Sequence, residues 1–294
     1  MPELPEVETV RRTLSRAIVG KRVKAIELHL AKLLRSPRSG LRRLIGARIT
    51  GLARRAKMLL IHFSNGTSLI VHLKMTGQLI YRPKRGSDKV GGHPIPHGER
   101  DLPNRYTQAI FSFSDGSRLF YNDLRKLGYF KCLPTTELEG LFNQMKLGPE
   151  PLDPKLTYKL FSTRLSRRFK SKIKDVLLDQ TVIAGLGNIY ADEVNYQAGL
   201  HPTRLTGSLS PTEQKRLFQA IQRILRLAIN KRGTTYRSFR DGLGRTGNML
   251  SCLKVYRRTG HPCRRCQTPI VRLKLGSRSA HFCPTCQKLH PANR

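Results

Sequence analysis

The chain has 294 residues, of which 38% are hydrophobic, and 55 lysines and arginines against 19 aspartates and glutamates give a formal net charge of +36. This length exceeds most single hydrophobic cores, so we expect two domains and a small appendage. The charge favours a polyanion whose phosphates it would neutralise, although composition alone also fits a ribosomal-type basic protein. No apolar run approaches the roughly 20 residues that span a bilayer, and the N-terminus lacks the apolar core of a signal peptide. We therefore expect a soluble cytoplasmic protein that is neither secreted nor bound to a membrane.

The first eight residues, MPELPEVE, admit two interpretations. If Met1 is removed, the ring nitrogen of Pro2 becomes a secondary amine, with Glu3 beside it. An α-amino group has an unperturbed pKa of about 7.7–8.0 and lysine one of about 10.4, so a useful fraction of the amine is neutral near pH 7 and can attack an electrophilic carbon. Alternatively, proline and acidic residues simply form the first turn of a helix. The octapeptide alone favours the helix.

Apolar residues recur every three or four positions after this opening, at Val7, Val10, Leu14 and Ile18. This spacing predicts an amphipathic helix over residues 5–19, which would anchor Pro2 against a core.

Two β-hairpins are predicted next, each around a favoured turn dipeptide. Their arms are residues 59–63 and 68–73 around Asn65-Gly66, and residues 109–113 and 118–121 around Asp115-Gly116. We therefore expect an antiparallel β-sandwich or barrel over residues 1–135. Residues 83–105, rich in glycine, proline, histidine and charge, are expected to form an exposed, mobile loop.

A change of composition near Gly148-Pro149-Glu150-Pro151 predicts a linker over residues 136–152 and a basic helical domain over residues 153–250. The clearest helix start is Ser210-Pro211-Thr212-Glu213, a capping box with proline at the first helical position. Earlier in this domain, Ala184-Gly185-Leu186-Gly187-Asn188 lies between two helical patterns. Asn188 would cap the following helix, an arrangement that binds phosphate, although an ordinary helix–helix turn is the alternative.

Four of the six cysteines are spaced as metal ligands. Cys263 and Cys266 form one C-x-x-C pair, and Cys283 and Cys286 form a second after sixteen residues. This is the spacing of a Cys₄ zinc ribbon, so residues 251–294 are predicted to form a hairpin held by one structural Zn²⁺ with no open coordination position. Cys132 and Cys252 are expected to be ordinary thiols.

The opening octapeptide, the Gly-Leu-Gly-Asn turn and the terminal cysteines occur in the order typical of one family. The chain resembles formamidopyrimidine-DNA glycosylases (8-oxoguanine DNA glycosylase/AP lyases) along essentially its whole length. Residues 177–202 resemble that family's helix-two-turn-helix motif. The resemblance implies an α+β multidomain protein: an N-terminal antiparallel β-sandwich with an N-terminal helix, a helix-two-turn-helix domain and a Cys₄ zinc-ribbon hairpin.

Four catalytic residues are implied by the resemblance. Pro2 would attack the sugar C1′, and Glu3 would be the acid/base group that helps to open the ring. Lys57 matches the lysine assigned to proton transfer in β-elimination. Arg278 matches the zinc-finger arginine that grips phosphate and is associated with δ-elimination.

Further positions match DNA contacts of the family. Met75 matches the side chain that fills the gap left by an extruded base, a role that suits an unbranched apolar residue. Arg125 would face the orphaned cytosine, with Leu127 as a second wedge. The other matching positions are His72, Tyr106, Lys174 and Asn188, and residues 233–247 resemble the loop that closes over the flipped base.

The sequence departs from the family pattern at several of these positions. Leu127 stands where the family usually has phenylalanine, and Lys74 replaces the ordinary glycine before Met75. Tyr106 and Gln108 replace an H-x-H pair, and Phe169 replaces a lysine. These changes bear on lesion preference and opposite-base discrimination.

The function implied is excision of oxidised purines, 8-oxoguanine and formamidopyrimidines, from duplex DNA by a monomeric bifunctional glycosylase/AP lyase. A Schiff base on Pro2 would be followed by β,δ-elimination, without a redox cofactor or a catalytic metal. Two alternatives are an endonuclease VIII-like enzyme for oxidised pyrimidines and a non-catalytic zinc-ribbon DNA-binding protein.

Overall fold

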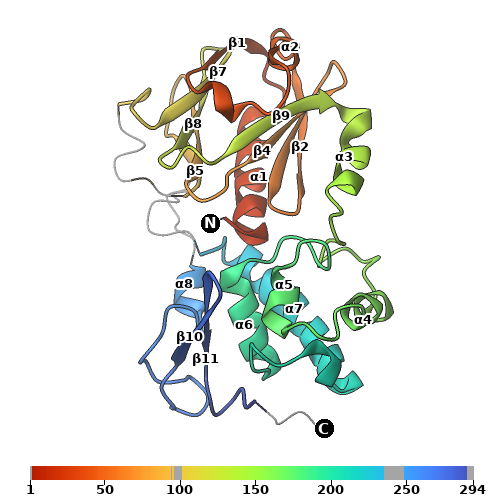
Figure 1. Ribbon diagram of the computed structural model, residues 1–294. Coiled ribbons are helices and arrows are strands. Elements are labelled where there is room, and N and C mark those ends of the chain that lie inside the picture. The colour runs from red at the N-terminus through yellow and green to blue at the C-terminus, as the bar shows by residue number, and fades with distance from the viewer. Residues whose placement is uncertain (1, 94, 96–100, 235–247, 290–294) are drawn as a thin grey trace. The chain divides into compact units, whose positions relative to one another are not determined.

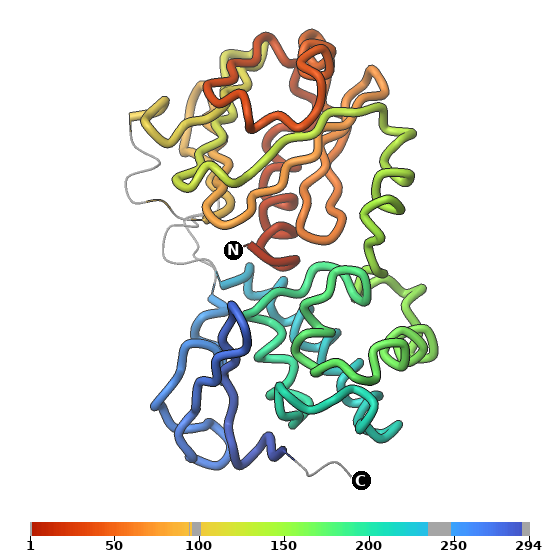
Figure 2. Tube along the Cα trace, in the orientation of Figure 1, coloured from red at the N-terminus to blue at the C-terminus, as the bar shows by residue number. Residues whose placement is uncertain are grey.

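The computed structural model describes residues 2–93, 95, 101–234 and 248–289, and the chain divides into two units (Figures 1 and 2). The first comprises Met1–Met145 and Lys231–Leu250, and the second comprises Lys146–Asn230 and Ser251–Arg294. This division differs from the expected domains and linker. The cysteine-bearing hairpin belongs to the helical unit, and the segment ending at Leu250 belongs to the β-rich unit.

Two antiparallel sheets form the first unit, with strand orders β1-β7-β8-β5-β6 and β2-β3-β4-β9. The strands are β1 (Val23–Leu28), β2 (Ile49–Arg55), β3 (Met58–Phe63), β4 (Thr67–His72), β5 (Gly77–Arg82), β6 (Lys89–Gly92), β7 (Thr107–Phe113), β8 (Arg118–Asp123) and β9 (Tyr129–Pro134). The helices are α1 (Leu4–Ile18), η1 (Ala31–Leu33), α2 (Arg38–Arg42), η2 (Thr135–Glu137) and α3 (Leu138–Gln144). The predicted antiparallel β-sandwich with an N-terminal helix is therefore confirmed, while the expected linker contains α3.

One apolar core lies between the two sheets. Phe130 of β9 contacts the opposite sheet through Tyr121, whose ring centroid is 4.9 Å away, and through Phe111, at 6.0 Å. Such offset and edge-on aromatic contacts add to the stabilisation that burial itself provides. The sandwich is thus a rigid base for the turns at its ends.

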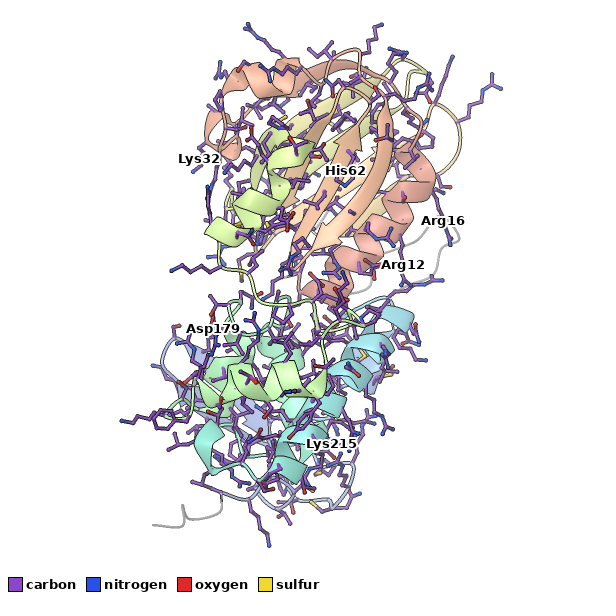
Figure 3. All side chains as sticks on the ribbon, turned by 90° about the vertical axis from the view of Figure 1, so that its right-hand side faces the viewer. Arg12, Arg16, Lys32, His62, Asp179 and Lys215 are labelled. Atoms are coloured by element: carbon purple, nitrogen blue, oxygen red, sulfur yellow. The ribbon has the colours of Figure 1, made fainter. Side chains whose placement is uncertain are left out.

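Helix α1 packs against strands of both sheets, chiefly β6 and β2. Its apolar residues Val7, Val10, Leu14 and Ile18 are each at most 1% exposed, as the helical spacing predicts. Arg12 and Arg16 lie on the opposite face and point outward (Figure 3). The amphipathic helix therefore fixes the N-terminal residues against the sandwich core.

Both predicted hairpins are present, as β3–β4 and β7–β8. The expectation of a loop over residues 83–105 is wrong in part, because β6 lies within it and pairs with β5. Gly91 explains how a glycine-rich segment becomes a strand here. A Cβ at this position would lie 2.9 Å from the Val10 side chain, so glycine lets the strand approach α1.

The second unit is mainly helical. Its elements are α4 (Tyr158–Ser166), α5 (Ile173–Leu178), α6 (Asn188–Ala198), η3 (Thr206–Ser208), α7 (Pro211–Asn230), β10 (Val271–Leu275) and β11 (Arg278–Phe282), while α8 (Met249–Cys252) spans the boundary. The capping box of α7 is confirmed, since Ser210 N donates to Glu213 (2.9 Å) and Glu213 N donates to Ser210 Oγ (3.3 Å). Helix α6 packs against α5, α7 and β11 and so links the helices to the hairpin.

Among the described residues, no helix combines the length and apolar character needed to cross a membrane.

Candidate active site and nucleic-acid interface

The N-terminal residues begin α1 through a reciprocal capping box. Glu3 is the N-cap; its carboxylate accepts the Glu6 N–H, and its own N–H donates to Glu6 Oε2 at 2.9 Å. Glu3 is only 2% exposed, and Pro2 is buried. The helical interpretation of the opening is correct, and it is compatible with the chemical one because the helix holds residue 2 in place.

Glu6 also anchors a distant segment of the first unit. Its Oε1 accepts both the backbone N–H (2.8 Å) and the hydroxyl (3.1 Å) of Thr234. Gly233 has φ +76°, and a Cβ there would lie 2.6 Å from Glu6 Oε1, so glycine is required. Beyond this point, Asn248 N donates to Lys231 O, and Met249 N to Gly233 O. These bonds close the base of the predicted lesion-capping loop, whose residues 235–247 lie outside the described part of the chain.

Lys57 lies in the two-residue turn between β2 and β3 and is 8% exposed. Strand β3 begins at Met58, one residue before the arm that the sequence predicted. Arg54 Nη1 donates to the carbonyl of Ala56 (2.9 Å), and its Nε lies 3.4 Å from Glu8 Oε2 on α1. Through Glu8 and Arg54, helix α1 therefore fixes the turn that carries Lys57. Burial opposes ionisation of Glu8, but hydrogen bonds from arginines lower its pKa below the ordinary value.

His72, at the end of β4, is neutral. Burial first, and then the charges of Lys74, Lys57 and Arg35, lower its pKa to about 3. Its Nδ1 accepts the Lys74 N–H at 3.0 Å, so the proton of the neutral ring is on Nε2. The Tyr129 ring lies 5.2 Å from His72 and 4.2 Å from the Arg35 guanidinium. The ring of His72 is therefore a hydrogen-bond donor among cations, which suits a phosphate oxygen.

Large apolar side chains are exposed on two neighbouring turns of the sandwich. Met75 is 37% exposed and Leu127 43%, and Leu124, which the sequence interpretation missed, is 48% exposed. Arg125 lies between the two leucines and is also exposed. Exposed apolar residues that flank a cation in a basic protein suit insertion between bases better than they suit water.

In both turns, a residue with positive φ precedes an exposed apolar side chain. Lys74 has φ +50° and Lys126 has φ +54°, a region that glycine occupies more easily. The Lys74 ammonium lies 5.7 Å from the Tyr129 ring centroid. The resemblance implies glycine at position 74, and this backbone conformation suits glycine. In this chain Lys74 adopts it instead.

Tyr106 borders the second of these turns through its backbone. Its carbonyl accepts the N–H of Asp123, the last residue of β8, at 2.9 Å, and the amide of Gln108 at 3.0 Å. The Arg105 guanidinium lies 4.9 Å from the Tyr106 ring centroid. Tyr106 and Gln108, which replace the H-x-H pair, are thus hydrogen-bonded to each other.

Lys174 and Asn188 meet at one carbonyl in the second unit. Lys174 Nζ (2.6 Å) and Asn188 Nδ2 (3.1 Å) both donate to Ser279 O, and Lys174 also pairs with Asp192 at 2.6 Å. The Lys174 side chain is 1% exposed, so its ammonium faces protein and not solvent. Ser279 directly follows Arg278, which is exposed at the start of β11. Both side chains therefore fix the strand that carries Arg278.

Asn188 does not cap helix α6, contrary to expectation. Gly187 is the N-cap residue, and Asn188 is the first residue of the helix, from which its side chain reaches β11. The turn before it is held by Gln180, whose Oε1 accepts Gly185 N and whose Nε2 donates to Leu186 O, both at 2.9 Å. These two hydrogen bonds fix the backbone of the turn.

Another buried network attaches β11 to α6. Asp192 Oδ2 accepts both the N–H (2.9 Å) and the Nδ1 (3.0 Å) of His281. Since its other oxygen pairs with Lys174, Asp192 joins α5 and β11 through α6. No local sequence pattern indicates this network, because its members are far apart in the chain.

The four predicted zinc ligands converge in the second unit. The sulfur atoms of Cys263, Cys266, Cys283 and Cys286 all lie within 4.8 Å of one another, with Sγ–Sγ separations of 3.4–3.8 Å among the closest pairs. A tetrahedral ion with Zn–S bonds of about 2.3 Å requires about 3.8 Å between sulfurs, so the donors fit Zn²⁺. The N–H groups of Arg265 and Cys286 donate to Cys263 and Cys283, as suits thiolates. These cysteines form a closed, structural zinc site.

A cavity of about 670 Å³ lies elsewhere in the first unit, between α2, β9 and α3. None of the predicted site residues lines it. Among these residues, Met75, Arg125, Leu127 and Arg278 are exposed on their own units, whereas Pro2, Glu3, Lys57 and Lys174 are buried.

Models of known protein families match three successive parts of the chain. Residues 1–130 match the formamidopyrimidine-DNA glycosylase N-terminal domain, residues 147–240 match the H2TH domain of formamidopyrimidine-DNA glycosylase, and residues 260–289 match a zinc finger found in FPG and IleRS. The formamidopyrimidine-DNA glycosylase of Pelotomaculum thermopropionicum is 44% identical, covering 98% of this chain and 100% of the relative. That of Streptococcus mutans is 41% identical over the same shares.

Solved structures agree as well. A mutant Lactococcus lactis FPG in complex with a Fapy-dG containing DNA has a TM-score of 0.87 and 36% identity, and covers 98% of this chain and 100% of its own. The Lactococcus lactis enzyme with an abasic site containing DNA has a TM-score of 0.86 and 35% identity over the same shares. The chain therefore belongs to the formamidopyrimidine-DNA glycosylase family, enzymes that act on damaged DNA.

Proposed function

We propose that this protein removes oxidised purines from duplex DNA and then cuts the strand through a Schiff base on Pro2. The observation that carries this proposal is the placement of residue 2 immediately before a capped helix, with the neighbouring Glu3 buried. Once Met1 is removed, the positive end of α1 favours the neutral amine over its protonated form. A neutral secondary amine is the form that attacks carbon.

The proposed steps use residues of the first unit. The Pro2 nitrogen attacks C1′, the glycosidic bond breaks, and the base leaves with the bonding electrons, while the proton that the Pro2 nitrogen loses neutralises the departing base. Glu3 supplies a proton to the sugar ring oxygen as the iminium forms. Lys57 carries protons in β-elimination, in which C2′ loses a proton and the C3′–O3′ bond breaks as the 3′ phosphate leaves. The same iminium then allows δ-elimination at C5′.

The second unit supports phosphate binding in this proposal. Arg278 grips the backbone and promotes the second elimination, while Lys174 and Asn188 act indirectly by holding the Ser279 carbonyl beside it. The zinc ion, when bound, only stabilises the hairpin. From the first unit, neutral His72 donates a hydrogen bond through its Nε2–H to a phosphate oxygen of the DNA. The proposed enzyme is a monomer of the cytoplasm, and its basic surface supplies most of the affinity for DNA.

Base excision requires the target nucleotide to leave the stack, which costs a few kcal/mol. Met75 and Leu127 would fill the gap, and Arg125 would face the orphaned base. Leu127 lacks the stacking ring usual in the family, so we expect weaker discrimination of the opposite base.

An alternative substrate is an oxidised pyrimidine. A Lactococcus lactis enzyme with 36% identity has been solved with an oxidized pyrimidine containing DNA, at a TM-score of 0.85. A second alternative, a non-catalytic DNA-binding protein, would need neither a free Pro2 amine nor Lys57.

Borohydride trapping tests these possibilities together. Duplexes carrying 8-oxoguanine opposite cytosine, or thymine glycol, are incubated with the protein and reduced. We expect a covalent complex on the first duplex that Pro2→Gly abolishes. A stronger complex on thymine glycol would support the pyrimidine alternative, and no complex on either would refute the enzymatic proposal.

A further inference from the structure

The two wedge turns connect the same pair of sheets at the same edge. Residues 73–76 lead from β4 to β5, and residues 124–128 lead from β8 to β9. At the base of these turns His72 pairs with Tyr129, and Gly77 pairs with Asp123. The turns therefore begin and end on neighbouring strands, although about fifty residues separate them in the sequence.

Asp123 is bonded to both turns. It ends β8 and is 1% exposed. Its Oδ1 accepts the hydroxyl of Thr76 (2.5 Å) and the N–H of Arg125 (3.2 Å), while Oδ2 accepts the N–H of Gly128 (2.7 Å). Hydrogen bonds from several donors compensate the cost of burying a carboxylate, and they also fix the positions of the donor groups.

Thr76 completes the connection from the other side. It directly follows Met75 and is 6% exposed. Its hydroxyl oxygen accepts the N–H of Arg125 at 2.9 Å while donating to Asp123. The backbone next to Met75 and the backbone of Arg125 are thus held by one pair of side chains.

Two glycines allow this close approach. A Cβ at Gly77 would lie 2.8 Å from the Tyr121 hydroxyl, and one at Gly128 would lie 1.7 Å from it. The Tyr121 hydroxyl itself is 3.5 Å from Asp123 Oδ2. Both turns are therefore packed onto the same buried group, with little room for independent movement.

We propose that Asp123, through Thr76, is a positioning residue that couples the two wedge turns, so that Met75, Arg125 and Leu127 enter the duplex as one preformed unit. This inference rests on the proposed function. Its physical basis is preorganisation: turns already fixed in the inserted arrangement lose less conformational freedom when the base leaves the stack. Asp123 touches neither the sugar nor the base in this scheme.

The test separates insertion from chemistry by the choice of DNA. A duplex with 8-oxoguanine needs the wedge, whereas a single strand with an abasic site has no opposite strand and no base to extrude. Asp123→Asn and Thr76→Val are compared with Asp115→Asn, which changes a carboxylate at the opposite end of β8. Base extrusion is followed by 2-aminopurine fluorescence, excision by single-turnover kinetics, and chemistry by borohydride trapping on the single strand.

We expect Asp123→Asn and Thr76→Val to slow extrusion and duplex excision on the order of tenfold. Trapping on the single strand should stay within about twofold of the unaltered protein, and Asp115→Asn should change neither rate. Because both residues act through one arrangement, the double variant should be no slower than Asp123→Asn alone.

Three outcomes would overturn the inference: duplex excision at the normal rate in both variants, an equal loss on duplex and single strand, or independent, multiplying losses in the double variant. Thr76→Val keeps the test decisive if Asp123→Asn fails to fold. Failure of the proposed function has a different signature, since the unaltered protein would then give no trapped complex on the single strand.

Discussion

Thr234 donates two hydrogen bonds to one oxygen of Glu6, while the other oxygen of Glu6 accepts the N–H of Glu3. One buried carboxylate thus joins the residue beside the proposed nucleophile to Thr234, which lies 228 positions after Glu6 and directly precedes the segment 235–247.

Replacing Glu6 should therefore disturb both places. We expect Glu6→Ala to lower the free energy of unfolding by about 2–3 kcal/mol, because three buried donors lose their acceptor. Thr234→Val, which removes only the hydroxyl bond, should cost about 1 kcal/mol. Urea unfolding measures both, with the exposed Glu139→Ala as the control. Equal stability of Glu6→Ala and the control would contradict this account.

His72 should make stability depend on pH. Its pKa in the folded protein is about 3, below the ordinary 6.5, so between these values only the unfolded state binds the proton. Stability from this residue is complete above pH 6.5 and falls as the pH is lowered towards 3. At pH 5 His72→Gln should recover about 2 kcal/mol relative to its difference at pH 8. Urea unfolding of both proteins from pH 4 to pH 8 checks the prediction, and parallel curves would disprove it.

Lys74 offers a test of backbone strain beside the wedge. Lys74→Gly and Lys74→Ala both remove the cation, but only glycine relieves φ +50°. We expect the glycine variant to be about 1 kcal/mol more stable than the alanine variant, despite the greater freedom of glycine in the unfolded chain. Thermal unfolding measures the difference. If Lys74 also binds phosphate, both variants should reduce the salt dependence of DNA binding by about one counterion.

Lys174 and Arg278 should behave differently, although the resemblance implies a DNA contact for both. Lys174→Met leaves Asp192 buried without its cation and should cost about 3–5 kcal/mol of stability. Arg278→Ala is an exposed change and should stay within about 0.5 kcal/mol while weakening DNA binding and the second elimination. Unfolding curves and product gels separate these effects. A stable Lys174→Met with weakened DNA binding would instead support a direct phosphate contact.

Zinc removal should affect the second unit before the first. We expect one zinc ion per chain, and Cys266→Ser or strong chelation should destabilise the hairpin that carries Arg278. DNA binding should fall with it, while the β-sandwich retains its far-UV signature. Metal analysis and circular dichroism measure these changes, and Cys252→Ser is the matched control outside the ligand set.

The sequence alone predicted the elements whose signals are local. The spacing of Val7, Val10, Leu14 and Ile18 located α1, the Asn-Gly and Asp-Gly dipeptides located two hairpins, and paired C-x-x-C spacing located the zinc site. In each case the residues that decide the structure are neighbours in the chain. Strand β6 was missed because its glycines read as a loop, and they form a strand only because α1 packs against them.

For the site as well, the sequence and the tertiary structure contribute different information. The catalytic roles of Pro2, Glu3, Lys57 and Arg278 come from the resemblance of the whole chain to a family and stay predictions, because no local pattern around any one of them indicates its role. Tertiary structure decided the partners: Thr234 on Glu6, Thr76 and Arg125 on Asp123, and Lys174 with Asn188 on the Ser279 carbonyl. Hydrogen bonds between residues tens or hundreds of positions apart leave no periodic or local pattern, so only the folded chain shows which groups they hold in place.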